Sequence, residues 1–133
     1  MTERKAEYKT NTLSEHDEQA ALIQWAHISE RDHPELMNLY AVPNGTYTTP
    51  ASAAKAHAEG LSKGVPDLCL AWPAGVYHGM YLEMKSKTGT LRPEQRTWLQ
   101  RLKAAGYYTA VCRSYEEARD AIMAYLAEEV DPY

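Results

Sequence analysis

Residues 64–85 read Gly-Val-Pro-Asp-Leu-Cys-Leu-Ala-Trp-Pro-Ala-Gly-Val-Tyr-His-Gly-Met-Tyr-Leu-Glu-Met-Lys, and they predict the central strand pairing of the protein. It contains two short runs that are rich in apolar and aromatic residues, at 65–72 and 80–85, and each has the length of a strand. Residues 73–79 between them begin with proline and include two glycines, which is typical of a turn. We therefore predict that the two runs pair as a β-hairpin.

The sequence before this hairpin predicts two helices and one strand. Ser14 is a typical helix N-cap, and apolar residues then recur at helical spacing over 15–30. A short strand-like run at 38–42 stops at a Pro-Asn-Gly turn over 43–45. A second, short helix is predicted over 50–60, between a Thr-Pro start and a closing glycine.

The sequence after the hairpin predicts a helix, a strand and a last helix. Pro93 begins a helix that Gly106 closes, strand-like residues follow at 107–112, and Ser114 caps a helix that runs to Leu126. The resulting order is α-β-α-β-β-α-β-α. We expect an α/β fold with a mixed central β-sheet flanked by helices, in which the late β-α-β crossover is right-handed.

Length and composition indicate one compact domain. The chain has 133 residues, of which 44% are hydrophobic and 24% charged, and this suits a single core. We predict a flexible tail over 1–13 and one domain over 14–133. No apolar run approaches the roughly 20 residues of a membrane helix, and the polar start lacks the apolar stretch of a signal peptide. We therefore expect a cytoplasmic protein with no membrane partner.

Both cysteines, Cys69 and Cys112, lie inside apolar strand-like runs. Cysteines in such runs are better interpreted as buried free thiols than as a disulfide scaffold. We therefore expect no cysteine-based zinc site.

The charges are unevenly distributed along the chain. The net charge is −4, which is unusual for a protein that binds phosphates. Residues 55–113, however, contain 9 basic and 4 acidic residues, a balance of +5, whereas the remaining residues contain 5 basic and 14 acidic ones, a balance of −9. The basic middle gives weak support for a nucleic acid partner, and the acidic ends have the ordinary explanation of solvated helix faces.

The hairpin also carries candidate catalytic residues. Side chains alternate between the two faces of a strand, so Glu83 and Lys85 project from the same face, roughly 6.5–7 Å apart. Pairing of the two runs brings Asp67 towards the same place. Mg²⁺ is usually held by one or two carboxylates together with substrate phosphates, so this set predicts a metal centre that hydrolyses phosphodiester bonds. The alternative is a solvated ion pair on an exposed strand, with Pro66-Asp67 as a simple turn.

These residues together resemble a known nuclease family. Pro66-Asp67 followed by Glu83-Met84-Lys85 resembles the PD-(D/E)xK nuclease superfamily, and the wider pattern is similar to its VRR-NUC (virus-type replication-repair nuclease) branch. The similarity runs from about Glu18 to Leu126. Its distinctive pieces are Glu18-Gln19, Pro43-Asn44-Gly45, Glu59-Gly60-x-x-x-Gly64-Val65-Pro66-Asp67, Gly79-x-x-x-Glu83-x-Lys85, and Leu91-x-x-x-Gln95-x-x-Trp98 followed by Gly106-Tyr107.

The resemblance implies a restriction-endonuclease-like core and a metal-dependent DNA endonuclease. It implies that Asp67, Glu83 and Glu18 bind Mg²⁺ or Mn²⁺ and that Lys85 serves catalysis. Gln95 matches the glutamine that follows the Glu-x-Lys strand of the family. The resemblance also implies a phage or bacterial source, and homodimers that cut branched DNA such as Holliday junctions. Without the resemblance, Glu18 would be interpreted as solvated helix surface.

Several further residues could contact DNA. Lys63, Lys87, Arg92 and Arg96 flank the expected centre and could hold phosphates, since Lys and Arg supply most backbone contacts. Asn44 could lie near DNA or serve only the turn. Each basic residue taken alone could equally be ordinary surface.

Three functions remain open from the sequence. The first is a nuclease that resolves four-way junctions as a homodimer, the second is a restriction-type or nicking nuclease of the same superfamily, and the third is a DNA-binding module that no longer cuts. The intact Asp67, Glu83 and Lys85 favour cutting. The chain has more large apolar groups than so small a core readily buries. A homodimer interface could cover the surplus, or the groups could all pack internally. They are Trp25, Trp72, Pro73, Val76 and Tyr77.

Overall fold

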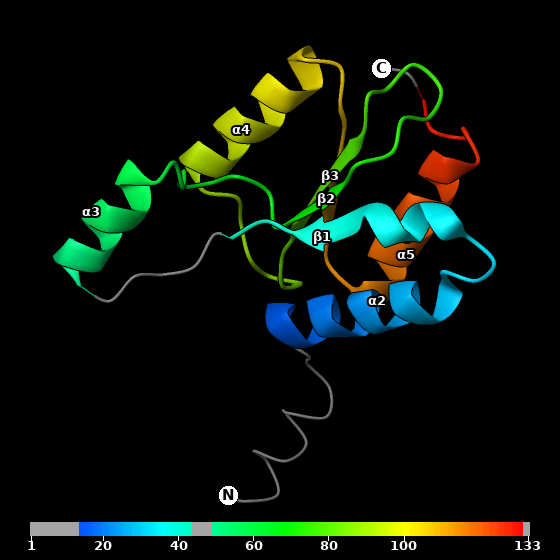
Figure 1. Ribbon diagram of the computed structural model, residues 1–133, viewed down its shortest axis with the longest axis horizontal. Helices are drawn as coiled ribbons and strands as arrows, with labels where there is room; N and C mark the ends of the chain where they lie inside the picture. Colours follow the sequence, from blue (N-terminus) through cyan, green and yellow to red (C-terminus); the bar gives the residue numbers. More distant parts are fainter. Residues whose placement is uncertain (1–13, 44–48, 132–133) are drawn as a thin grey trace, which may run out of the picture.

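The computed structural model describes residues 14–43 and 49–131, which form the mixed α/β arrangement in Figure 1. The tail predicted over 1–13 and the turn residues Asn44 and Gly45 lie outside the described residues. Within the described ranges, no helix is long and apolar enough to cross a membrane. The elements in chain order are α2 (Glu15–Ser29), the 3-10 helix η1 (Pro34–Asn38), β1 (Leu39–Ala41), α3 (Pro50–Ala58), β2 (Leu68–Leu70), β3 (Met80–Met84), α4 (Pro93–Ala104), β4 (Tyr108–Cys112) and α5 (Tyr115–Leu126).

The four strands form one sheet in the order β1-β2-β3-β4. β1 pairs antiparallel with β2, and β2 pairs antiparallel with β3, whereas β3 and β4 are parallel. The hairpin predicted from residues 64–85 is therefore confirmed. The mixed sheet between helices and the order of the elements are confirmed as well, with η1 as an addition.

All four strands are shorter than the sequence predicts, by one residue for β3 and β4 and by more for β1 and β2. β2 covers three residues rather than 65–72, because Pro66 offers no amide hydrogen and the amide of Trp72 turns back to donate to the Leu70 carbonyl at 2.9 Å. β1 is short because the residues before it form η1, which the sequence did not predict. Pro34 begins η1, and Leu36 in its middle is buried in the core.

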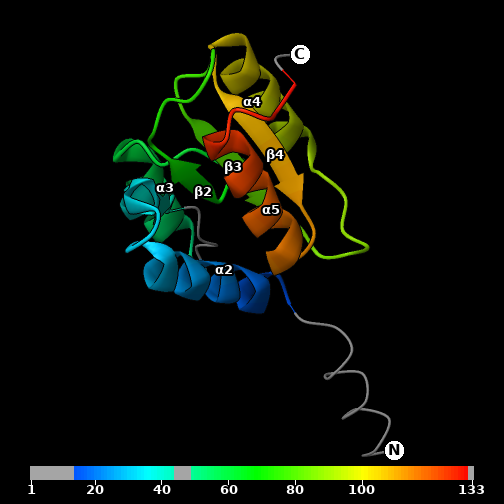
Figure 2. The same cartoon turned by 90° about the vertical axis from the view of Figure 1, so that its right-hand side faces the viewer.

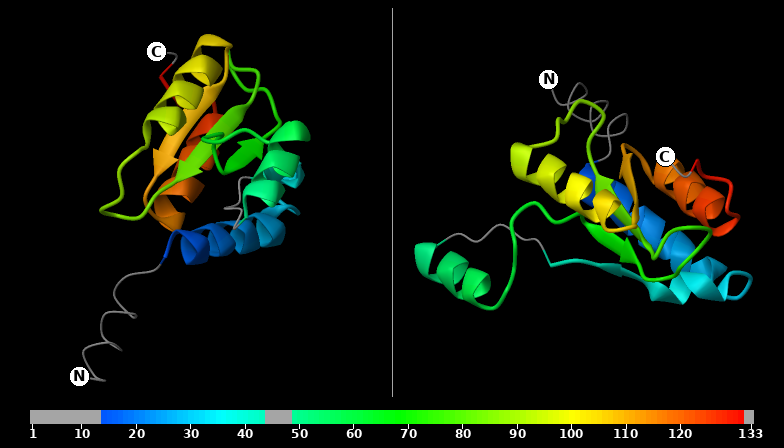
Figure 3. Two further views of the ribbon diagram at one scale, coloured as in Figure 1. Left: turned by 90° about the vertical axis from the view of Figure 1, so that its left-hand side faces the viewer. Right: turned by 90° about the horizontal axis from the view of Figure 1, so that it is seen from above.

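Helices cover the two faces of the sheet unequally. α5 lies on one face and α4 on the other, as Figure 2 and the left view of Figure 3 show. α2 packs against α5 and β3 on the first face, and α3 extends away from the sheet (Figure 1). The hydrophobic core lies between the sheet and the pair α2 and α5, and its buried residues are Leu22, Ala26, Leu36, Leu68, Leu70, Met80, Leu82, Met84, Cys112, Ala118, Ile122 and Tyr125.

Some of the expected surplus of apolar groups is packed internally. Trp25 and Tyr77 pack against the core, and the Tyr77 ring lies 5.3 Å from the Tyr108 ring. Trp72 and Val76, in contrast, remain 41% and 72% exposed. The expectation that both cysteines are buried free thiols is confirmed.

Candidate active site

The hairpin register places two carboxylates directly opposite each other. Leu68 faces Leu82 and Cys69 faces Tyr81 across β2 and β3, so continuing the register by one residue places Asp67 opposite Glu83. Leu68 and Leu82 point into the core, and alternation therefore directs Asp67 and Glu83 to the other face, which α4 partly covers. The pairing of β2 with β3 thus explains why Asp67 and Glu83 lie close together, as the sequence predicts.

Both carboxylates are fixed by hydrogen bonds. The Met84 amide donates to Asp67 Oδ2 at 2.7 Å, and Gln95 Nε2 donates to Glu83 Oε2 at 3.0 Å. Gln95 is itself oriented, because its Oε1 accepts the Arg92 amide at 2.8 Å in the first turn of α4. Gln95 therefore connects α4 to β3 and holds one oxygen of Glu83 in place.

The second oxygen of Glu83 has no such partner. Glu83 is 2% exposed, and no amide or amine donor among the described residues reaches its buried Oε1 atom; the Asp67 carboxyl is close enough to interact with Glu83, but the two can form a hydrogen bond only when they share a proton. A buried carboxylate oxygen without a partner is costly, and such atoms in native proteins require an explanation, such as an ion. The solvated strand-surface alternative for Glu83 is thereby excluded.

Burial and mutual repulsion shift the pKa values of the pair. Burial raises the pKa of Glu83 from its ordinary value of 4.5 to about 8, and the negative charge of Asp67 adds to this increase. Burial also raises the pKa of Asp67, against the Met84 hydrogen bond, which lowers it. Lys85 is only 7% exposed, and its positive charge lowers both pKa values without cancelling the increase. The pair therefore gains from any further positive charge placed beside it.

These carboxylates lie in a cleft of about 630 Å³. Of the residues predicted to contact DNA, Lys63 and Arg92 line this cleft, whereas Lys87 and Arg96 are exposed outside its lining. Arg96 instead donates to the Leu91 carbonyl at 2.9 Å. Asn44 lies outside the described residues. The lining residues are Glu15, Pro43, Ala53, Ala56, His57, Leu61, Ser62, Lys63, Gly64, Asp67, Glu83, Lys85, Arg92, Glu94 and Gln95.

A close approach of two backbones brings the basic residues together. Gly64 has φ +93°, and a Cβ added there would lie 2.7 Å from the backbone carbon of Glu94. Only glycine fits this position, because a side chain would be strained and would collide with the first turn of α4. The segment before β2 is therefore held against α4, so that Lys63 and Arg92 share one cleft.

Two of the three acidic residues in the first turn of α2, Glu15 and Glu18, lie in different surroundings. The Glu18 carboxylate accepts the Tyr115 amide at 2.7 Å, at the start of α5, and Glu18 does not line the cleft. Glu15 does line the cleft, and its negative charge raises the pKa values of Asp67 and Glu83. Its Oε1 accepts the Ser86 amide at 3.2 Å. Glu15 is thus the α2 carboxylate that faces the pair.

Helical periodicity could not have predicted which of Glu15 and Glu18 faces the carboxylate pair. Glu15 and Glu18 precede the buried Leu22 by seven and four residues, so both lie on the stripe of α2 that faces the sheet. Among the described residues, no group of three or more His, Cys, Asp and Glu side chains is arranged to hold a metal ion. The cleft therefore offers a two-carboxylate site, with Glu15 nearby.

The comparisons with known proteins agree with this geometry. A mixed sheet that presents Pro-Asp on one strand against Glu-x-Lys on the next is the arrangement of the PD-(D/E)xK nuclease superfamily. The chain belongs to the VRR-NUC family, whose domain model matches residues 3–116. A solved structure described as a VRR_NUC domain protein has a TM-score of 0.73 and 25% sequence identity, covering 86% of this chain and 89% of that chain. No match was found among curated protein sequences.

Proposed function

We propose that this member of a nuclease family is a DNA endonuclease that requires a divalent metal ion, with Asp67, Glu83 and Lys85 as its cutting centre. The observation that carries the proposal is the buried Glu83 oxygen without a partner, in a carboxylate placed opposite Asp67 at the base of a cleft. An apolar or amide side chain at this position would make the folded protein more stable, because burial disfavours the charged carboxylate.

The residues present suit Mg²⁺ or Mn²⁺. Mg²⁺ keeps several waters and is usually bound by one or two carboxylates plus phosphate oxygens, which is what Asp67 and Glu83 offer in an open cleft. Glu15 could add a third oxygen from α2, in place of the Glu18 expected from the sequence. A bound divalent ion would supply a Lewis acid that polarises the scissile phosphate and makes a water molecule more acidic.

The protein groups around the carboxylates have separate roles in this proposal. Lys85 Nζ would stabilise the negative charge that builds on the phosphate oxygens, and its burial strengthens that effect. Gln95 and the Met84 amide would hold the carboxylates in fixed orientations, so that little reorganisation is needed when substrate binds.

Lys63 and Arg92 would hold the DNA backbone in the cleft, since they line it beside the carboxylates. Lys87 and Arg96, which are exposed outside the cleft lining, and Asn44 remain proposed DNA contacts. Branched DNA such as a Holliday junction remains the proposed substrate, and a symmetric homodimer the proposed active form, because a two-fold dimer supplies two cutting centres with the symmetry of such a junction.

The test is cleavage of a panel of labelled DNAs by the purified protein. Duplex, flap, fork and four-way substrates are incubated with Mg²⁺, Mn²⁺ or EDTA, and light scattering is measured on the same samples. We expect cutting with either metal, none in EDTA, and a preference for the four-way DNA by a particle of twice the 15.0 kDa chain mass. Full activity in EDTA would contradict the metal centre, whereas equal cutting of linear duplex by a monomer would contradict only the substrate and the dimer.

A further inference from the structure

Three tyrosines lie beside the carboxylate pair on the same face of the sheet. In the sheet register Tyr40 faces Cys69, and Cys69 faces Tyr81, so these residues form the row next to Asp67 and Glu83. Rows two residues apart along a strand are separated by roughly 6.5–7 Å. Tyr107 lies on the same face but one row farther from the carboxylates, opposite Gly79 in the continued register, and its ring lies 5.3 Å from the Tyr81 ring in an edge-on contact.

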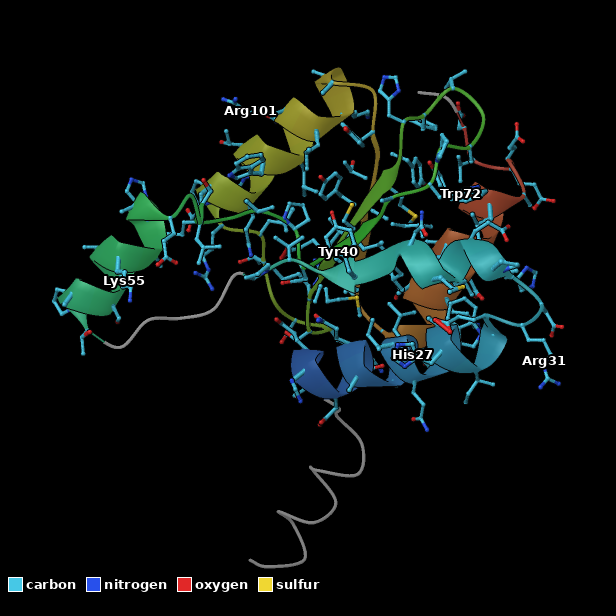
Figure 4. The ribbon with its side chains drawn as sticks, viewed as in Figure 1. His27, Arg31, Tyr40, Lys55, Trp72 and Arg101 are labelled. Carbon is cyan, nitrogen blue, oxygen red and sulfur yellow. The ribbon has the colours of Figure 1, made fainter. Side chains whose placement is uncertain are left out.

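The Tyr40 ring is open to solvent. Tyr40 is 52% exposed on β1, one of the two edge strands of the sheet, and Figure 4 shows it beside the β1 ribbon. The side chains of Tyr40 and Tyr81 both interact with the Cys69 thiol on β2, so the Tyr40 ring leans across the sheet. Tyr81 and Tyr107 are half-buried beside it. The row therefore presents aromatic surface rather than a closed core.

The backbone connects this aromatic surface to the cleft, although none of the three tyrosines lines the cleft itself, and Tyr107 lines a second cavity of about 200 Å³. Residues 40–43 form one extended segment that leads from Tyr40 to Pro43, which lines the cleft. The Val42 amide donates to the Asp67 carbonyl at 2.8 Å, so the segment is fixed to the residue that carries the first carboxylate. The neighbouring helix α4 contains Arg96, Arg101 and Lys103 against one acidic residue, a charge balance that favours a polyanion.

We propose that Tyr40, Tyr81 and Tyr107 form a tyrosine platform on which an unpaired base of the DNA substrate stacks, next to the scissile phosphate at the proposed metal centre of Asp67 and Glu83. This inference rests on the proposed nuclease function and specifies its substrate as DNA with at least one unpaired base near the cut. Aromatic side chains stack well on bases, but only on bases that are splayed out of a duplex. The row separation corresponds to about two steps of 3.4 Å along one strand.

A second copy of the chain is the other occupant to consider for the tyrosine platform. A stable interface needs roughly 800 Å² from each partner. A fully buried aromatic side chain contributes roughly 150–250 Å², and two of the three tyrosines are already half-buried. The tyrosine platform alone is therefore too small for a dimer interface, whereas it has the size of one or two bases.

The test separates stacking from simple apolar contact at Tyr40. The probes are a single-stranded oligothymidylate that carries one 2-aminopurine, and the same strand paired in a duplex. Ca²⁺ replaces Mg²⁺ so that binding is measured without cutting. The variants are Tyr40→Ala, Tyr40→Leu and Tyr40→Phe, and Ile28→Ala serves as the control, because Ile28 is 73% exposed on α2, which covers the opposite face of the sheet.

We expect the wild type to quench 2-aminopurine fluorescence in the single strand, and Tyr40→Phe to retain this quenching. Tyr40→Ala and Tyr40→Leu should lose it and should bind the single strand roughly 5- to 150-fold more weakly, with a smaller loss on the duplex. Ile28→Ala should match the wild type on both probes.

The tyrosine platform would be overturned if Tyr40→Ala lost as much affinity for the duplex as for the single strand, or if Tyr40→Leu bound the single strand as tightly as the wild type. Conversion of a dimer into a monomer by Tyr40→Ala would also overturn it, by assigning the surface to a second copy. A wild type that cuts DNA with Mg²⁺ but never quenches the probe would refute the platform alone. A wild type that neither binds nor cuts any DNA would refute the proposed function as well.

Discussion

Replacing Glu83 with glutamine should make the metal-free protein more stable at neutral and alkaline pH, although the variant loses its function. The folded protein holds the pKa of Glu83 at about 8 against an ordinary value of 4.5. The folded state therefore favours the protonated carboxyl, and folding becomes less favourable as the group ionises. Stability from this group is fully present below about pH 4.5 and is lost as the pH rises through about 8.

The magnitude follows from this pKa difference. Each unit is worth about 1.4 kcal/mol, and relaxation and water penetration around a buried carboxylate reduce the full difference, so we expect a gain of about 2 kcal/mol for Glu83→Gln at pH 8 in EDTA. The glutamine can still accept the Gln95 hydrogen bond through its amide oxygen. For a domain of this size the gain corresponds to a Tm increase of roughly 5–10 °C.

Thermal unfolding followed by circular dichroism between pH 5 and pH 8 measures this effect. The wild-type Tm in EDTA should fall across that range, and the fall should be smaller for Glu83→Gln. Mg²⁺ should raise the wild-type Tm at pH 8 but leave the variant unchanged, because a ligand that binds only the folded state stabilises it. Glu129→Gln, at an exposed position after α5, is the control and should follow the wild type. Parallel curves for the wild type and Glu83→Gln would show that folding does not raise the pKa of Glu83.

Three further predictions concern the neighbours of this carboxylate. Lys85→Ala should leave Mn²⁺ affinity in calorimetry near the wild-type value but slow DNA cleavage on the order of 10²–10³-fold, about 3–4 kcal/mol, because it removes a charge and no metal ligand; cleavage at the wild-type rate would show that the lysine has no catalytic role. Gln95→Ala removes the donor to Glu83 Oε2, and Mn²⁺ affinity or cleavage should fall roughly 10–100-fold. An unchanged Gln95→Ala enzyme would mean that the hydrogen bond does not orient the carboxylate. Glu15→Ala should weaken Mn²⁺ binding with little change in Tm, whereas Glu18→Ala should lose about 0.5–2 kcal/mol of stability, measured by urea unfolding, because it releases the first amide of α5. If Glu18→Ala weakens Mn²⁺ binding and Glu15→Ala does not, Glu18 rather than Glu15 is the metal ligand.

The parts of the site that depend on local geometry could be predicted from the sequence. Strand alternation placed Glu83 and Lys85 on one face, and the hairpin register, which is set by residues close in sequence, brought Asp67 opposite Glu83. Gln95 could be identified only through the family resemblance. Its contact with Glu83 requires α4 to fold back over β3, which no local pattern describes.

The remaining features depend on tertiary packing. Glu15 and Glu18 share one stripe of α2, and only the position of that helix against the sheet decides that Glu15 faces the cleft. The burial of Glu83 likewise arises from elements distant in sequence, and so the exposed ion pair could not be excluded beforehand. The cleft itself depends on the close approach of the Gly64 backbone to Glu94. A glycine at position 64 is compatible with such an approach, but the sequence does not say which segment approaches it.

The most direct test of the metal centre is cleavage of one labelled four-way DNA by wild type, Glu83→Gln and Glu129→Gln, each with Mg²⁺ and with EDTA. If the buried carboxylate pair holds the metal for cutting, the wild type and Glu129→Gln cut only with Mg²⁺, and Glu83→Gln cuts under neither condition despite its higher Tm in EDTA. Cutting by Glu83→Gln at the wild-type rate, or cutting by the wild type in EDTA, would contradict the account.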